Sequence, residues 1–271
     1  MRKILSLLSL LILALTVTGC GGSQTEKLVV GMECAYAPFN WTETEKTETN
    51  VPIANFPGTY AEGYDVQIAK LIAKELGKEL EVVAIEWGGL IAALNTNQID
   101  LVIAGMSPTP ERLETIDFTE AYYSGHHVFV VSADSELVNA TTFDAFVGKK
   151  VSGQIGTIYA DLAAQAVDKG MVAGPNKDTV GQIILDINKK IVDATIVELP
   201  VALGLCKSNP NLKYVDLGQN VFDVAAEDII VSIGVRKNYE LKTQINDILA
   251  SISTEERNQI MSNAVNNSPA E

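Results

Sequence analysis

Arg112 ends a short stretch of small and hydroxylated residues, AGMSPTPER at 104–112, that follows the apolar run IDLVIA. The guanidinium of an arginine binds a carboxylate through two parallel hydrogen bonds, which a lysine cannot provide. Gly105 lets a ligand approach the backbone, and the Ser107 hydroxyl can donate or accept a hydrogen bond. The same spacing fits a surface arginine paired with a neighbouring acidic side chain. The stretch therefore predicts a carboxylate-binding loop or a surface ion pair.

Two other polar groups also lie where a predicted strand gives way to a helix. Gly156 and Thr157, in GQIGTIYADL, precede a helix whose free N–H groups and dipole favour an anion, although Thr157 would also serve as an ordinary cap. Glu198 ends the apolar strand of VDATIVELP, where a carboxylate needs a cationic partner unless it faces solvent. Ligands of open α/β sheets bind at the carboxyl ends of strands, so we expect these groups to converge there.

Aromatic residues near the first strands supply rings that either stack on a ligand side chain or pack in the core. These residues are Tyr36, Phe39, Trp41 and Trp87. Glu33 lies at the end of the first predicted strand and is a second acid able to line a pocket. The polar groups together predict a clamp for a zwitterion, in which Arg112 and the Thr157 N–H hold a carboxylate and Glu198 holds an ammonium. A ligand held between two lobes would draw them together.

The elements that must position these groups alternate between strands and helices. The first series has strands at 27–33, 80–87 and 99–105 and helices at 64–77 and 89–97, with Asp65 as the N-cap and Gly77 as the stop of the first helix. A polar segment at 42–63 is interpreted as a surface loop. A further helix begins at Pro110 with Thr109 as its cap. A second series follows: strands at 126–132, 148–155, 192–198, 212–217 and 229–237, and helices at 159–170, 179–190, 200–208, 239–253 and 254–265. Such apolar strands indicate parallel α/β sheets covered on both faces.

The composition excludes some classes of ligand. The chain has 271 residues, 47% hydrophobic and 20% charged, with a formal net charge of −14. A surface of this charge repels nucleic acid and anionic membrane, so we expect neither as a ligand. Two histidines and scattered cysteines indicate no metal site, haem or other cofactor. Cys34 and Cys206 are expected to be buried free thiols, although an exported protein could oxidise them.

The N-terminus is predicted to be an export signal rather than part of the fold. Met1–Lys3 is basic, and residues 4–17 are apolar but too short to span a bilayer as a stable anchor. The ending VTGC resembles a bacterial lipobox, which implies a signal peptide at 1–19, acylation of Cys20 and a flexible tether at 20–27. Two or three acyl chains anchor a protein stably, whereas one does not. A plain secretory signal with an incidental cysteine is the alternative.

The motifs as a set resemble a known family. Five stretches, in this order along the chain, are similar to the polar amino-acid substrate-binding proteins (family 3) of ABC transporters. They are GYDVQIAKLIAKELG, a tryptophan followed by spaced leucines and ID, AGMSPTPERLETIDFTEAYY, GKKVSGQIGT and VDATIVELPVA. The resemblance covers nearly all of the mature chain. It implies a type II periplasmic-binding-protein-like fold, α/β in class, with two hinge strands near 124–131 and 222–230. Lobe 1 would span 28–124 plus 225–271, and lobe 2 would span 125–224.

The resemblance also implies roles for individual residues. Arg112 would bind the α-carboxylate with help from Ser107, Gly156 and Thr157, and Glu198 would bind the α-ammonium. Tyr36 and Trp87 would stack on the ligand side chain. Glu33 matches a position where binders of basic amino acids carry an acid, which favours arginine or lysine over glutamine-like and other amino acids. The implied pocket residues are Glu33, Tyr36, Trp87, Gly105, Met106, Ser107, Arg112, Gly156, Thr157, Ile158 and Glu198.

The implied protein is an extracytoplasmic lipoprotein, a monomer, that delivers a free amino acid to an ABC permease with its ATPase and is held at the cell membrane through Cys20. Three departures from the family pattern bear on this: Glu198 where aspartate is frequent, Ile158 where a small polar residue is frequent, and the long 42–63 segment. A dehydratase-like enzyme on the same scaffold is one alternative, with Glu33, His126 and His127 as its acid–base candidates. An amino-acid sensory domain acting through a separate partner is the other.

Overall fold

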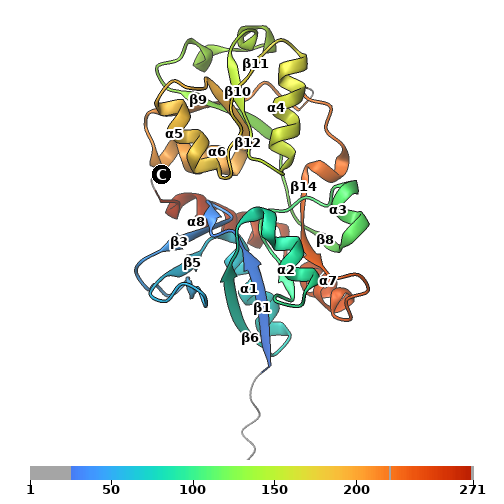
Figure 1. Ribbon diagram of the computed structural model, residues 1–271. Helices are drawn as coiled ribbons and strands as arrows, with labels where there is room; N and C mark the ends of the chain where they lie inside the picture. Colours follow the sequence, from blue (N-terminus) through green and yellow to red (C-terminus); the bar gives the residue numbers. More distant parts are fainter. Residues whose placement is uncertain (1–25, 220, 270–271) are drawn as a thin grey trace, which may run out of the picture.

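The computed structural model describes residues 26–219 and 221–269, which form two lobes stacked on each other (Figure 1). The predicted signal peptide, Cys20 and all but the last two residues of the tether lie outside the described residues. Each lobe is built on one five-stranded sheet, and helices pack against both sheets. None of the described helices is long and apolar enough to cross a membrane.

Lobe 1, at the bottom of Figure 1, contains both the N-terminal strands and the last two helices. Its sheet has the order β6-β1-β7-β14-β8. The strands β1, β6 and β7 run parallel, whereas β14 is antiparallel to both β7 and β8, so the sheet is mixed rather than wholly parallel. The bounds are β1 (Lys27–Met32), β6 (Glu79–Ala84), β7 (Leu101–Val102), β8 (Asp117–Ser124), β14 (Ile230–Val235), α1 (Tyr64–Glu75), η1 (Trp87–Gly89), α2 (Leu90–Asn95), α3 (Pro110–Thr115), η4 (Ala226–Asp228), α7 (Lys242–Ser251) and α8 (Thr254–Asn267).

Lobe 2 carries a second mixed sheet of order β11-β10-β12-β9-β13, in which β10, β11 and β12 are parallel and β9 is antiparallel to both of its neighbours. The chain enters this lobe between β8 and β9 and leaves it between β13 and β14. The two crossing segments are joined where the Gly125 N–H donates to the Ile229 carbonyl at 3.0 Å. The bounds are β9 (His127–Ser132), η2 (Glu136–Asn139), η3 (Phe143–Phe146), β10 (Lys150–Ser152), α4 (Ile158–Asp168), β11 (Val172–Ala173), α5 (Val180–Asn188), β12 (Ala194–Glu198), α6 (Leu199–Ser208) and β13 (Leu212–Val215).

The segment predicted as a surface loop at 42–63 is instead part of a small antiparallel sheet of order β2-β3-β5-β4. Its strands are β2 (Ala35–Tyr36), β3 (Asn40–Glu43), β4 (Val51–Pro52) and β5 (Tyr60–Glu62). Strands of two to four residues are too short to show an alternating pattern, which is why the sequence did not predict them.

The prediction of Asp65 as the N-cap of the first helix is wrong. Gly63 is the cap, with φ of +127°, and a Cβ at this position would come within 2.4 Å of the Phe39 carbonyl oxygen. The helix N-terminus packs directly on that backbone, because the Asp65 N–H donates to the Phe39 carbonyl at 2.8 Å. Asp65 therefore lies inside the first turn and is wholly buried. The stop at Gly77 is confirmed by its left-handed φ of +65°.

The helix predicted from Pro110 is confirmed at its start but is short. Thr109 caps it by accepting a hydrogen bond from the Arg112 N–H, and the helix ends at Thr115. The strand β8, which follows directly, was not predicted. The last helix also returns to lobe 1, and its end contacts lobe 2 where Lys207 Nζ donates to the Asn266 carbonyl at 2.9 Å.

Candidate functional site

A cleft of about 920 Å³ separates the two lobes. Lobe 1 lines it with residues from 33–35, 86–91 and 106–115, and lobe 2 lines it with residues from 155–165 and 178–182. An adjoining cavity of about 10 Å³ has room for about one water molecule. The lobes thus contact each other closely along part of the cleft.

The structure brings all but one of the residues predicted for the pocket to this cleft. Each of the following lines one or both cavities: Glu33, Tyr36, Trp87, Gly105, Met106, Ser107, Arg112, Gly156, Thr157 and Ile158. Glu198 lines neither cavity and is buried, with 4% of its surface exposed. Of the other aromatic candidates, Phe39 and Trp41 are core residues.

Arg112 extends from α3 towards lobe 2. Its Nη1 donates to the Ser107 carbonyl at 2.8 Å, which fixes the guanidinium against its own loop. Its Nη2 donates to the Gly156 carbonyl of lobe 2 at 3.2 Å, and the guanidinium lies 5.1 Å from the ring centroid of Trp87. Trp87 Nε1 donates to the same Gly156 carbonyl at 2.8 Å. The cationic fork thus lies at the contact between the lobes, on the face of an aromatic ring.

Thr157 caps α4 and shapes the opposite wall. Its Oγ accepts from the Tyr159 N–H at 3.2 Å and donates to the Gln154 carbonyl at 2.8 Å. Gly156 adopts a left-handed φ of +71°, which turns its carbonyl towards lobe 1. The sequence predicted that the N–H groups at this helix start would make the polar contacts. The contact across the lobes is made instead by the Gly156 carbonyl.

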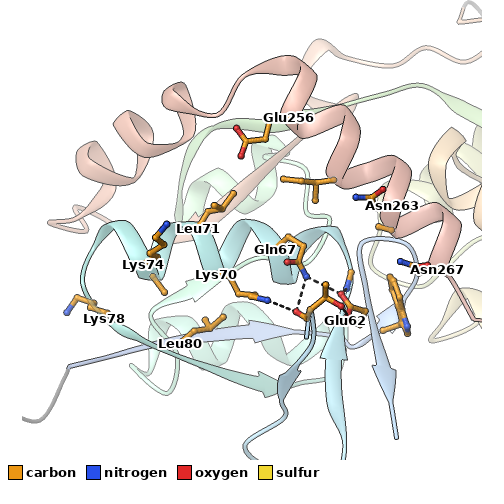
Figure 2. A pocket seen from close by; sticks show the side chains of 16 residues that line it. Glu62, Gln67, Lys70, Leu71, Lys74, Lys78, Leu80, Glu256, Asn263 and Asn267 are labelled. Atoms are coloured by element: carbon orange, nitrogen blue, oxygen red, sulfur yellow. Dashed lines mark hydrogen bonds between the residues drawn. The ribbon is translucent and has the colours of Figure 1, made fainter. Parts of the chain in front are cut away.

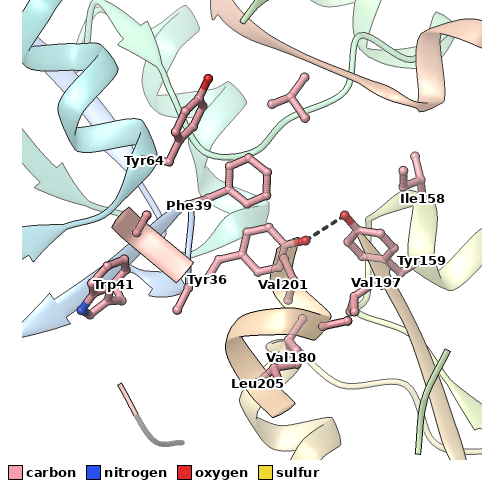
Figure 3. Packing of buried hydrophobic residues seen from close by; sticks show 14 of the residues in the cluster. Tyr36, Phe39, Trp41, Tyr64, Ile158, Tyr159, Val180, Val197, Val201 and Leu205 are labelled. Atoms are coloured by element: carbon pink, nitrogen blue, oxygen red, sulfur yellow. Dashed lines mark hydrogen bonds between the residues drawn. The ribbon is translucent and has the colours of Figure 1, made fainter. Parts of the chain in front are cut away.

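Glu198 occupies the junction of β12 and α6, where the sequence predicted a carboxylate in need of a partner. The partners are two phenols: Tyr36 donates to Glu198 Oε2, and the hydroxyls of Tyr36 and Tyr159 are 2.8 Å apart (Figure 3). Burial raises the pKa of Glu198, and the hydrogen bonds from Tyr159 and Tyr36 oppose that rise. Since Tyr36 comes from lobe 1, this cluster also joins the lobes.

Glu33 lies in the cleft, where Gln154 Nε2 of lobe 2 donates to its Oε1 at 3.0 Å. Burial raises the pKa of Glu33 to about 7; the hydrogen bond from Gln154 opposes this rise and the nearby Glu86 carboxylate adds to it. The acids that line the cleft are Glu33, Glu86, Glu111, Asp161 and Asp178, and Arg112 is the one Lys or Arg among its lining residues. Such a wall favours a cationic ligand.

Neither histidine lines the cleft cavities. His127 is buried with its ring 5.9 Å from that of Tyr159, and burial lowers its pKa to about 4. His126 is hydrogen-bonded to Asp216 at 2.9 Å. Cys34 and Cys206 are both free, the first buried and the second half-buried. Within residues 26–219 and 221–269, no group of His, Cys, Asp and Glu side chains is arranged to hold a metal ion.

Sequence reasoning missed four of the acids that line the cleft, Glu86, Glu111, Asp161 and Asp178, and two residues that join the lobes. Gln154 contacts Glu33 across 121 positions of sequence, and Tyr159 contacts Tyr36 across 123 positions. Only the closure of the lobes brings such pairs together, so no local spacing could have predicted them.

A second cavity, of about 590 Å³, lies within lobe 1 between α1 and α8 (Figure 2). Its walls include Leu71, Leu80 and Ile260, with three lysines of the α1 side along the rim. It draws on a single lobe and contains none of the residues predicted for the pocket. The convergence of charged groups from both lobes makes the cleft the candidate functional site.

Residues 28–265 match the model of the bacterial extracellular solute-binding proteins, family 3. The chain belongs to this family. It is 31% identical over 255 residues to the arginine-binding extracellular protein ArtP of Bacillus subtilis, covering 92% of each chain. It is 27% identical over 223 residues to a probable histidine-binding protein of Campylobacter jejuni, covering 78% of this chain and 80% of that one.

Solved structures of the family agree with the fold. The substrate-binding protein AbpA of Streptococcus pneumoniae, bound to L-arginine, superposes with a TM-score of 0.74 at 28% identity and covers 90% of this chain and 97% of its own. An ancestral arginine-binding protein bound to arginine gives a TM-score of 0.70 at 29% identity, with coverage of 88% and 97%. The predicted two-lobe fold is confirmed. The family 3 protein is an extracytoplasmic amino-acid-binding component of an ABC transporter, and the prediction that it is not an enzyme is confirmed by the family.

Proposed function

We propose that this family 3 protein captures arginine or lysine in the cleft and delivers it to an ABC permease that works with its ATPase. We further propose that the chain acts as a monomer held at the cell membrane through acylated Cys20. The observation that carries the choice of ligand is the acidic cleft wall, which has five carboxylates and a single guanidinium.

The guanidinium of Arg112 recognises the α-carboxylate. Its contact with Ser107 presents the fork in a fixed direction, and Trp87 backs its face. A ligand carboxylate would replace the Gly156 carbonyl as the acceptor of Nη2, so a neutral acceptor gives way to a charged one. Hydrogen bonds between charged groups are about twice as strong as those between neutral groups, which makes this exchange favourable.

The α-ammonium is expected to take the place of a phenol at Glu198. In this structure the Tyr36 hydroxyl donates a hydrogen bond to that carboxylate, and Tyr36 lies in the wall of the narrow cavity. When the lobes separate, Tyr36 moves away with lobe 1 and Glu198 becomes accessible from the cleft. An ammonium is a stronger donor to a buried carboxylate than a phenol and also supplies the cation that burial of this carboxylate calls for.

The distal cation of the ligand is expected to meet Glu33. Its present partner Gln154 supplies one neutral hydrogen bond, whereas a guanidinium or ammonium would supply charge as well. Closure then follows from population shift, because contacts to both lobes exist only in the closed form. Opening on the permease would release the amino acid. The relative ArtP is named as an arginine-binding protein and AbpA was solved bound to L-arginine, which supports this ligand class.

A thermal-shift screen against the twenty amino acids tests the ligand class. The protein, residues 21–271, is first unfolded and refolded to remove co-purified ligand. Arginine or lysine at about a hundred times its dissociation constant should stabilise the protein by about 2.7 kcal/mol, and the uncharged amino acids should do far less. A shift with glutamate or leucine but none with arginine or lysine would overturn the basic-ligand proposal.

The anchor is tested separately, in cells that express the full chain with either Cys20 or Cys20→Ala. The wild-type protein should fractionate with the membrane and incorporate labelled palmitate, and the variant should do neither. A variant that remained with the membrane would contradict anchoring through Cys20.

A further inference from the structure

Asp65 is a buried carboxylate for which the family resemblance supplied no role. It lies in the first turn of α1, has no exposed surface and accepts a hydrogen bond from each of two side chains. No ion pair to it occurs within the described part of the chain. A buried carboxylate without a cation is costly, so its hydrogen bonds must compensate that cost.

Two of the three segments by which lobe 1 lines the cleft carry its predicted ligand contacts other than Trp87. The aromatic loop, residues 33–40, carries Glu33 and Tyr36, and the arginine loop, residues 104–112, carries Ser107 and Arg112. These loops are far apart in sequence and lie close together in the fold, where a Cβ added to Gly105 would come within 3.1 Å of the Tyr36 ring. Whatever sets the distance between the loops also sets the shape of the pocket.

Asp65 is connected to the aromatic loop through Asn40. Asn40 Nδ2 donates to Asp65 Oδ2 at 2.7 Å, and Asn40 Oδ1 accepts from the Cys34 N–H at 2.7 Å. The backbone N–H can only donate, so the amide oxygen must face Cys34 and the amide nitrogen must face Asp65. Cys34 has a left-handed φ of 56°, unusual for a residue with a side chain, and directly follows Glu33.

Asp65 is connected to the arginine loop through Tyr122 and Gly105. Tyr122 donates its hydroxyl proton to Asp65 Oδ1 at 2.7 Å, and the same hydroxyl accepts from the Gly105 N–H at 3.2 Å. Tyr122 thus links the Gly105 N–H to the Asp65 carboxylate. Asp65 is therefore connected to both loops, through Asn40 to one and through Tyr122 to the other.

We propose that Asp65 is a positioning residue that fixes the aromatic loop and the arginine loop relative to each other, and so sets the pocket for the amino acid. This inference rests on the proposed function, because both loops matter only if they bind the ligand. Asp65 touches no ligand itself. Its carboxylate is suited to the task because it accepts from several donors at once, whereas an amide presents one acceptor and one donor group.

Replacing Asp65 with asparagine distinguishes this role from simple packing. Whichever way the new amide turns, its NH₂ group faces another donor, either Asn40 Nδ2 or the Tyr122 hydroxyl, so that the link to one of the two loops loses its acceptor at position 65. We expect Asp65→Asn to weaken arginine binding by about tenfold or more in calorimetric titration. Amide hydrogen exchange at Cys34 or Gly105 should accelerate by a similar factor.

The matched control is the exchanged pair Asp65→Asn with Asn40→Asp. The amide at position 65 can then accept from Tyr122 and donate to position 40, where the new carboxylate accepts from the Cys34 N–H. Every hydrogen bond of the network is restored, so affinity and amide protection should return to within about threefold of the wild type. Circular dichroism and thermal melts of all three proteins report on folding.

Three results would overturn the proposal. The first is Asp65→Asn with a lowered thermal midpoint but unchanged arginine affinity, which would make the residue a packing element. The second is an exchanged pair that folds without recovering affinity. The third is unchanged amide protection at Cys34 and Gly105 in Asp65→Asn.

The amide exchange requires no ligand, so it tests the positioning role independently of the proposed function. A wild-type protein that binds no amino acid would refute the proposed function, while the exchange result still decides the positioning role. If Asp65→Asn does not fold, the exchanged pair and Tyr122→Phe, which removes one tether only, are compared with the wild type by the same measurements.

Discussion

Acidification from pH 8 to pH 6 should weaken the binding of arginine, because Glu33 takes up a proton in this interval. Burial raises the pKa of Glu33 to about 7 in the ligand-free protein. A carboxyl group with a raised pKa is neutral below that value, so the charge that faces the ligand cation is present at pH 8 and largely lost at pH 6. The guanidinium of arginine stays protonated throughout.

The size of the effect follows from the ionised fraction. With a pKa of about 7, about nine tenths of Glu33 is ionised at pH 8 and about one tenth at pH 6. If the ligand binds only the ionised form, the apparent dissociation constant scales with the inverse of that fraction and rises about tenfold. Binding should also release close to one proton per arginine near pH 6, because the bound cation lowers the pKa of Glu33.

Calorimetric titration at pH 6, 7 and 8 measures both quantities, with buffers of different ionisation heat reporting proton release. Glu33→Gln is the matched variant: it keeps the hydrogen-bonding shape and removes the titration of Glu33, so the pH dependence of its weaker affinity should fall well below tenfold. The pH dependence that remains in Glu33→Gln is assigned to other groups such as Asp65, whose pKa burial also raises to about 7. Equal wild-type affinity at pH 6 and pH 8, or a tenfold change that survives in Glu33→Gln, would refute this reasoning.

Three other predictions concern Arg112, Glu198 and Asp65. Arg112→Lys should weaken amino-acid binding by about tenfold or more, because an ammonium cannot form the paired hydrogen bonds, while the ligand-free thermal midpoint moves little; titration beside a thermal melt checks both. Tyr159→Phe should lower the free energy of unfolding in urea by about 1–3 kcal/mol, since Glu198 stays buried and loses a donor. The free energy of unfolding should fall as pH rises from 4 to 7, because burial raises the pKa of Asp65 from 3.8 to about 7 and only the folded chain keeps that proton. Urea titrations should show this contribution, up to about 4 kcal/mol, to be missing in Asp65→Asn.

The fold was predictable where the hydrophobic pattern is long. The helix α1 has its apolar residues at helical spacing, and the buried strands β9 and β12 appear as continuous apolar runs. The strand β8 was missed because it directly follows the short helix α3, and its burial does not alternate regularly. The small sheet that includes β4 and β5 was missed because its strands are too short for any period to appear.

The cleft was predictable at the level of residue chemistry. Arg112, Thr157 and Glu33 were singled out because an arginine, a capped helix start and an acid lie at strand ends. The partners of Arg112 and Glu33 in lobe 2, the Gly156 carbonyl and Gln154, could not be predicted, since only the fold brings these segments close. Glu198 illustrates the limit: the need for a partner was evident from its apolar strand, but the phenols that fulfil it are set by lobe closure.

Asp65 shows how a local rule can mislead. Its place before an apolar helical pattern is typical of an N-cap. The cap is instead Gly63, because the helix start packs so closely against the Phe39 carbonyl that a side chain at position 63 would not fit. Asp65 therefore lies inside the helix, where its carboxylate accepts hydrogen bonds from Asn40 and Tyr122. Tertiary packing decided between the two positions, and only the structure reveals it.

The central claim, that the cleft recognises a basic amino acid by its charge, is tested most directly with a matched pair of ligands. Arginine and citrulline have almost the same shape, but citrulline carries an uncharged urea group in place of the guanidinium. Calorimetric titration of the refolded, ligand-free protein at pH 8 should give one arginine per chain, bound at least about a hundredfold more tightly than citrulline. Equal affinities for the two, or no binding of arginine, would contradict the account.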